Sequence, residues 1–282
     1  MNNIPMQTQS PMSQRAANAF SNPLIRKLGK VEEHAAGKLA ASYGGITAKT
    51  AFFLLATIGG LALYYILDLF YFSTLPQMEI VTDEITYYFS GTELIFLGIA
   101  LLLTILTPIL AFLIRPTIPV TGTLYSISQG FVLAWIIDII LVGYEWIAWA
   151  ALGITIILVA LMAVLYTARI IKVGKKFRAV LTVLFLTMII SSLACLTLYF
   201  IPATSGFVTS IMDNPIISIA FTVLGIIVAT LFLLSDFDAI ERTVNNSLPK
   251  KYEWLAAFAL AFTVIWIYLK VLDLLVQVTD RS

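Results

Sequence analysis

Cysteine, histidine and charged residues are all scarce in this sequence. The 282 residues include one cysteine, Cys195, and one histidine, His34, and only 12% of them are charged. A single cysteine excludes an internal disulfide framework. One cysteine and one histidine cannot supply a zinc-type ligand set. We therefore expect neither a metal site nor any other cofactor.

Recognisable catalytic motifs are also missing. The sequence contains no HExxH, GxSxG or glycine-rich phosphate-loop motif, and its one histidine leaves no usable Ser–His–Asp set. The net charge of +1 gives no reason to expect nucleic acid as a partner. The sequence thus predicts neither an enzyme nor a nucleic-acid-binding protein.

Apolar residues are abundant instead. They make up 60% of the chain, and the mean hydropathy is +0.96, whereas soluble domains average roughly 45–50% apolar residues. A span of the ~30 Å hydrocarbon layer needs about 20 apolar residues. Seven stretches meet this condition, and they predict an all-α polytopic membrane protein: Ala48–Phe72, Glu93–Ile114, Val120–Val142, Ile147–Ile170, Arg178–Ile201, Ile216–Ser235 and Trp254–Val278.

The polar start of the chain and the loop charges predict the domains and the orientation. Residues 1–46 are polar and read as a partly disordered segment without a signal peptide, whereas residues 47–282 form the seven-helix domain. Lysine and arginine occur in the N-terminal segment and in the second, fourth and sixth connections, and in none of the others. The positive-inside rule then places the N-terminus in the cytoplasm and the C-terminus outside.

Five ionisable residues lie within or at the ends of the apolar stretches: Asp138, Asp236, Asp238, Lys270 and Asp273. Charges inside a span are costly, at least about 2.5 kcal/mol each on insertion scales, and are functional candidates by default. Lys270 and Asp273 share a helical face, whereas Asp236 and Asp238 cannot. The cluster is either an ion or proton pathway or a structural ion pair that orients the helices. Asp138 either belongs to a pathway or reaches the outer surface, as we expect of Glu93.

The sequence resembles the Bax inhibitor family, the transmembrane Bax inhibitor motif proteins, in its larger bacterial branch. The likeness is carried by ASYGGITAKTAFFLL, AFLIRPTIPVTGTLYSISQGFVLAW, LLSDFDAIERTVNNSLPKKYEWLAAFAL and IYLKVLDLL. The resemblance implies seven helices, with the last one central and wrapped by the other six. It also implies a pH-sensitive calcium leak, closed by an aspartate pair on the last two helices and latched by an arginine on the second.

The family motifs assign roles to particular residues. The sixth-helix aspartate corresponds to Asp236, four residues before Ile240, and the latch arginine corresponds to Arg115 in AFLIR. The seventh-helix aspartate corresponds to Lys270 in IYLKVLD, with Asp273 one turn further on. An Asp facing a Lys predicts an ion pair in place of the carboxylate pair. Protonation of Asp236 would release Arg115, so acid would loosen the gate.

Two functions remain open from the sequence. The first is a pH-sensitive cation leak or exchanger in the bacterial inner membrane, with calcium or protons as the transported ions. The second is a membrane regulator that transports nothing and acts by contact with a membrane protease or stress-response partner. Family resemblance supports both, and the intramembrane charges favour the first.

Overall fold

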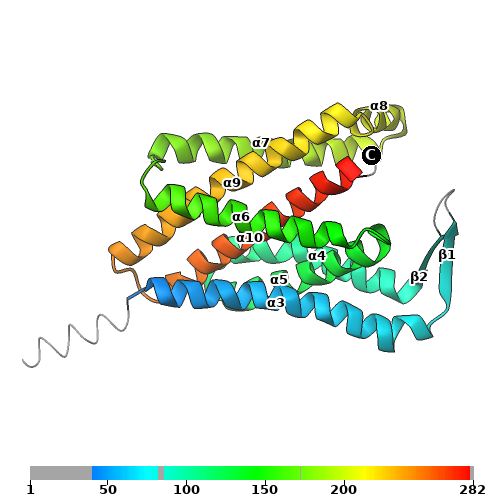
Figure 1. The fold of residues 1–282 in the computed structure, drawn as a ribbon, viewed down its shortest axis with the longest axis horizontal. Coiled ribbons are helices and arrows are strands. Elements are labelled where there is room, and N and C mark those ends of the chain that lie inside the picture. Colours follow the sequence, from blue (N-terminus) through cyan, green and yellow to red (C-terminus); the bar gives the residue numbers. More distant parts are fainter. Residues whose placement is uncertain (1–39, 82–85, 172, 280–282) are drawn as a thin grey trace, which may run out of the picture.

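The computed structural model describes residues 40–81, 86–171 and 173–279, and it is almost entirely helical in these ranges. Figure 1 shows long helices lying roughly alongside one another. The elements, in chain order, are α3 (Tyr43–Phe70), η1 (Phe72–Thr74), β1 (Gln77–Val81), β2 (Thr86–Ser90), α4 (Gly91–Leu113), η2 (Arg115–Thr117), α5 (Ile118–Trp135), the π-helix η3 (Ile136–Ile140), α6 (Trp146–Thr167), α7 (Lys175–Tyr199), α8 (Pro202–Met212), α9 (Pro215–Asn245) and α10 (Tyr252–Thr279).

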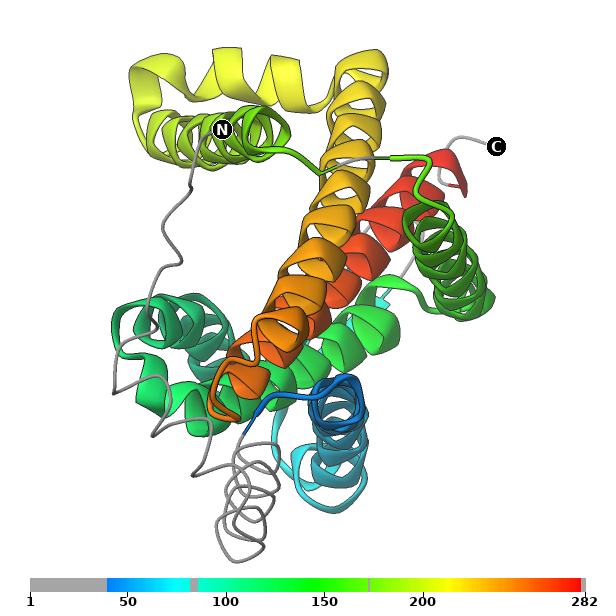
Figure 2. The same ribbon diagram turned by 90° about the vertical axis from the view of Figure 1, so that its left-hand side faces the viewer.

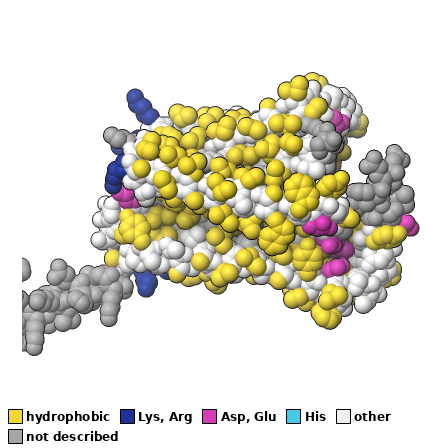
Figure 3. Space-filling view, viewed as in Figure 1, with side chains coloured by type: hydrophobic (Ala, Val, Ile, Leu, Met, Phe, Trp, Pro, Cys, Tyr) yellow, Lys and Arg dark blue, Asp and Glu magenta, His cyan; other side chains and the backbone are white. Residues whose placement is uncertain are grey.

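Among the described residues, seven of the eight α-helices, all except α8, are long and apolar enough to cross a membrane. Apolar side chains cover the middle of the molecule, with Lys and Arg gathered at the left end and Asp and Glu near the right end of Figure 3. We call the end where α3, α5, α7 and α10 begin the basic end, and the opposite end the acidic end. The prediction of an all-α polytopic membrane protein is confirmed.

Several element boundaries differ from the predicted ones. α3 begins at Tyr43, because the Ser42 side chain accepts a hydrogen bond from the backbone N–H of Gly45 and caps the helix. Residues 1–39 of the predicted polar segment lie outside the described residues. An antiparallel hairpin of β1 and β2 fills the first connection, and α8 fills the fifth. α9 continues to Asn245, so Asp236 and Asp238 lie within a helix instead of ending one.

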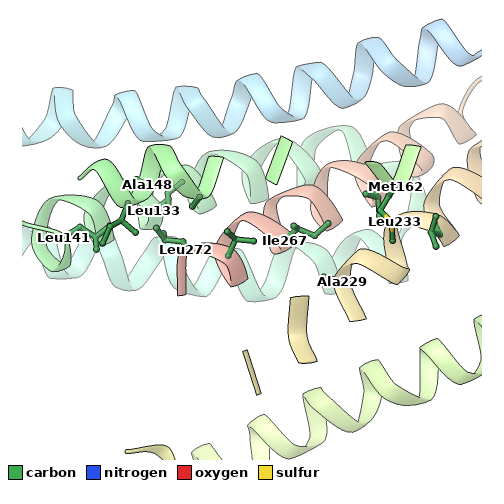
Figure 4. Close-up of a cluster of buried hydrophobic side chains, with 12 residues drawn as sticks. Leu133, Leu141, Ala148, Met162, Ala229, Leu233, Ile267 and Leu272 are labelled. Atoms are coloured by element: carbon green, nitrogen blue, oxygen red, sulfur yellow. The ribbon is translucent and has the colours of Figure 1, made fainter. Parts of the chain in front are cut away.

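The last helix, α10, is central. It packs against α3, α5, α6 and α9, and its Trp266 contacts Phe185 of α7 at a ring-centroid distance of 5.4 Å. Figure 4 shows Ile267 and Leu272 of α10 within the main buried cluster, between residues of other helices. α5 and α10 are the most buried spans and α7 is the least buried. The central position that the resemblance implied for the last spanning helix is therefore confirmed.

Small residues set the closest helix contact. Gly60 of α3 faces the backbone carbonyl of Ile127 on α5, and Gly130 of α5 faces the backbone carbonyl of Thr57 on α3. A Cβ at either glycine would overlap the opposite backbone. Inside a membrane, where burial of apolar surface gives helices little reason to associate, such close backbone approach supplies much of the attraction.

Candidate functional site

Asp236 lies on α9 and faces α10. Its Oδ2 accepts a hydrogen bond of 2.6 Å from the Thr263 hydroxyl of α10. Within the described ranges, no lysine, arginine or histidine forms an ion pair with this carboxylate. A carboxylate inside a span is thus held by a single neutral donor, and this leaves its charge available to a proton or a cation.

The Asp236 carboxylate lines a pocket of about 260 Å³. Residues of four helices, α4, α7, α9 and α10, line it, and Figure 2 shows α4 and α7 on the same side of α9 and α10. The wall is mostly aromatic and aliphatic, and its only titratable side chain is that of Asp236. The lining residues are Ala111, Phe185, Phe232, Ser235, Asp236, Leu255, Phe258, Ala259, Phe262, Thr263 and Trp266.

Lys270 is not the α10 residue that faces Asp236. The partner of Asp236 is Thr263, and Lys270 lies seven residues further along α10, or roughly 10 Å at 1.5 Å per residue. The Lys270 stem packs instead over Gly225 of α9, where an added Cβ would lie 3.1 Å from its Cδ. The predicted pairing of Asp236 with Lys270 is therefore wrong in register, because the α10 residue that faces Asp236 is Thr263.

Arg115 is also separate from Asp236. It begins the short helix η2 between α4 and α5, its side chain is exposed, and it forms no ion pair within the described part of the chain. The predicted contact between Arg115 and Asp236 is absent from this structure. The latch role that the resemblance implied for Arg115 therefore has no supporting contact among the described residues of this structure.

Lys270 and Asp273 belong to a polar network nearer the acidic end. Lys270 Nζ lies 3.4 Å from Asp273 Oδ2, which also accepts a hydrogen bond of 2.9 Å from the Thr222 hydroxyl. Gln277 donates from Nε2 to Asp273 Oδ1 at 2.8 Å, and its Oε1 accepts from the Ser218 hydroxyl at 2.8 Å. This network joins α9 to α10 and satisfies both carboxylate oxygens of Asp273, as expected of a structural ion pair that orients two helices.

Asp238 points away from Asp236, as their spacing predicted. Its carboxylate pairs with Arg242 one turn along α9 and lies 3.7 Å from Arg178 Nη1 on α7. Three residues further on, the Glu241 carboxylate accepts hydrogen bonds from the Tyr166 hydroxyl and from Arg169. These ion pairs attach α6 and α7 to α9 at the basic end. The charge of Asp238 is compensated by Arg242 and Arg178.

Asp138 is partly buried and belongs to a hydrogen-bonded group at the acidic end that the sequence did not reveal. The Tyr64 hydroxyl of α3 lies 3.0 Å from Asp138 Oδ2 and 3.0 Å from Glu93 Oε1. Glu93 lies in the first turn of α4, in a capping box with Ser90, and is only 3% exposed, so the expectation that it reaches water is wrong. Asp138 lies in η3, and π-helical turns often occur at functional sites.

The hydrogen bonds of Tyr64 with Glu93 and Asp138 require more protons than the hydroxyl group of Tyr64 can supply. A phenol has one proton to donate, and an ionised carboxylate can only accept. Tyr64 can therefore satisfy only one of its two carboxyl neighbours, and the second hydrogen bond requires a proton on Glu93 or Asp138. We expect infrared spectra of the purified protein at neutral pH to show the C=O stretch of a protonated, hydrogen-bonded carboxyl that shifts in Tyr64→Phe.

That assignment has a direct control. Glu93→Gln or Asp138→Asn should remove the band, depending on which carboxyl holds the proton, whereas Asp273→Asn should leave it in place. A spectrum that is unchanged in Tyr64→Phe, Glu93→Gln and Asp138→Asn would show that both carboxyls are ionised and that Tyr64 bonds to only one of them.

Glu253 is a second buried carboxylate that the sequence did not reveal. It begins α10 with its side chain fully buried, pairs with Lys49 of α3, and accepts a hydrogen bond of 2.9 Å from the backbone N–H of Ser42. The missing side chain of Gly45 leaves room for this carboxylate. An acidic residue in the first turn of a helix is common at a water interface, so its position gave no signal of burial.

Comparison with known proteins decides the family. The family model described as Bax inhibitor 1 like matches residues 7–280. The chain belongs to this family. A search of the curated proteins found no match. Membership in the Bax inhibitor family agrees with the seven spans and the central α10 that the resemblance implied.

Proposed function

We propose that this Bax inhibitor family protein is a pH-sensitive cation leak in the bacterial inner membrane, with calcium as the first ion to test. The observation that carries the proposal is the Asp236 carboxylate, which lines a pocket among four spanning helices and has no cationic partner among the described residues. The positive-inside rule favours a cytoplasmic position for the basic end. The gate would then lie in the cytoplasmic half of the protein.

The pH dependence follows from what surrounds Asp236. Thr263 faces it from α10, Phe185 from α7 and Ala111 from α4, and none of these side chains titrates. The nearest charges along α9, those of Asp238 and Arg242, pair with each other. A proton and a metal cation therefore compete for one carboxylate. Under this competition acid lowers the flux, because a proton neutralises Asp236. An arginine latch predicts the opposite, because protonation of Asp236 would release Arg115 and loosen the gate.

We expect calcium flux into liposomes containing the full chain to fall as the pH decreases through the titration of Asp236. Asp236→Asn should lower the flux at neutral pH at least about tenfold, since a fixed charge that faces an ion is worth more than 1.4 kcal/mol inside a span. The same substitution should remove the pH dependence. The measurement is the fluorescence of a calcium dye trapped in the vesicles.

The matched control is Asp213→Asn, which removes an exposed carboxylate in the turn between α8 and α9 and should leave both flux and pH profile unchanged. Flux that rises in acid would contradict the competition and favour an arginine latch formed in another conformation. If no variant shows flux, the leak is refuted, and a regulator that acts by contact becomes the better explanation.

A further inference from the structure

The wall of the Asp236 pocket is aromatic to a degree that a small inorganic ion does not require. Phe185, Phe232 and Trp266 form one cluster, with ring centroids 5.1 Å apart for Phe185 and Phe232 and 5.4 Å apart for Phe185 and Trp266. Phe258 and Phe262 line the same pocket with centroids 6.3 Å apart. Five rings from three helices, α7, α9 and α10, thus surround one space.

The polar part of the pocket is small and negative. Asp236 supplies its only charge, and the other polar side-chain groups of the lining residues are the hydroxyls of Ser235 and Thr263 and the indole N–H of Trp266. The Thr263 hydroxyl donates a hydrogen bond to the Asp236 carboxylate and so holds it in place. Within the described ranges no protein cation neutralises this charge. The pocket is therefore complementary to a ligand that combines a positive charge with apolar surface.

We propose that this pocket binds a small lipophilic ammonium ion. An aromatic face attracts an ammonium group by about 0.5–2 kcal/mol, most strongly when the ring is a tryptophan. A carboxylate in the same apolar space adds direct charge attraction. A strongly hydrated ion gains little from aromatic walls, because it must lose water to touch them, whereas an organic ammonium presents carbon atoms that favour the rings. The volume of about 260 Å³ suits a ligand with one ring.

The proposal shares Asp236 with the proposed leak but does not depend on conduction. A binding experiment on the full-length protein in nanodiscs tests it, with benzyltrimethylammonium as the probe and neopentylbenzene, its uncharged isostere, as the control ligand. We expect calorimetric titration to show at least about tenfold tighter binding of the cation than of the isostere, because the two differ in charge and hardly in shape.

Two substitutions separate the contribution of the Asp236 charge to the affinity from that of the Trp266 ring. Asp236→Asn should reduce the preference for the cation to what the aromatic rings alone provide and leave binding of the isostere unaffected, whereas Trp266→Leu should weaken binding of the cation while Asp236 remains in place. Phe200→Leu changes an exposed ring outside the pocket and should change neither. Circular dichroism and size-exclusion profiles identify any variant that fails to fold.

Equal binding of the cation and the isostere to the unaltered protein would overturn the proposal without the need for any variant. Undiminished preference for the cation in Asp236→Asn would overturn it as well. Binding without calcium flux refutes the leak alone, and flux without binding refutes the ammonium site alone, so the two proposals fail separately.

Discussion

Gly60→Ala is expected to destabilise the helix bundle by about 3 kcal/mol, at the upper end of what overpacking a close contact costs. A Cβ at Gly60 would overlap the backbone carbonyl of Ile127 on α5. Backbone atoms cannot turn away as a side chain can, so α3 and α5 would have to separate along their length. Thermal unfolding of the purified protein in detergent, followed by circular dichroism, measures the loss.

The neighbouring glycine provides the matched control. Gly59 has no atom within 4 Å of the position that a Cβ would occupy. Gly59→Ala should therefore leave the unfolding temperature unchanged or raise it slightly, because alanine is the better helix former by about 1 kcal/mol. Gly130→Ala should reproduce the effect of Gly60→Ala from the opposite helix. Equal unfolding temperatures for Gly59→Ala and Gly60→Ala would show that the α3–α5 crossing is looser than described.

Helix number and the faces of single helices could be predicted from the sequence, because they depend on residues that are near one another in the chain. The length of each apolar stretch decides whether it can span, and the spacing of Asp236 and Asp238 decides that they face different ways. The structure confirms the seven spans, and it directs Asp236 toward α10 and Asp238 toward Arg178.

The pairing between helices could not be predicted in this way. Spacing along α10 fixes which residues share a face, but it does not fix how far α10 slides along α9. That register decides whether Asp236 faces Thr263 or Lys270, and thus whether the site is a carboxylate with a neutral donor or an ion pair. Matching a short motif to a family carries the same uncertainty, because the Tyr-Leu that precedes Lys270 lies along the helix from the residue that faces Asp236, which is Thr263.

The burial of polar residues near helix ends could not be predicted from the sequence either. Tyr64, Glu93 and Glu253 lie where a membrane helix commonly meets water, and their residue types are ordinary at that depth. The structure buries all three, because a neighbouring helix covers each position and supplies its partner. Only the partner residues, distant in the sequence, reveal that these side chains lie inside the protein.

Lys49→Met is the second substitution from which we expect a large loss of stability, again about 3 kcal/mol. Lys49 is the only cation that pairs with Glu253 among the described residues, and the Glu253 side chain is fully buried between the starts of α3 and α10. Removing one partner of a buried pair leaves the other charge uncompensated, which is the expensive case. The two hydrogen bonds from Ser42 would remain, but neither carries a full positive charge.

The double substitution separates charge from packing. The double variant Lys49→Met, Glu253→Gln has no buried charge at this site. It should therefore recover much of the stability that Lys49→Met alone loses. The changes in unfolding free energy of the two single variants should thus be far from additive. Lys175→Met, at the exposed start of α7, controls for the loss of a lysine at the same end of the molecule. Additive losses in the double variant would mean that Glu253 is already neutral, and α3 would then be held to α10 by the Ser42 hydrogen bonds and apolar packing alone.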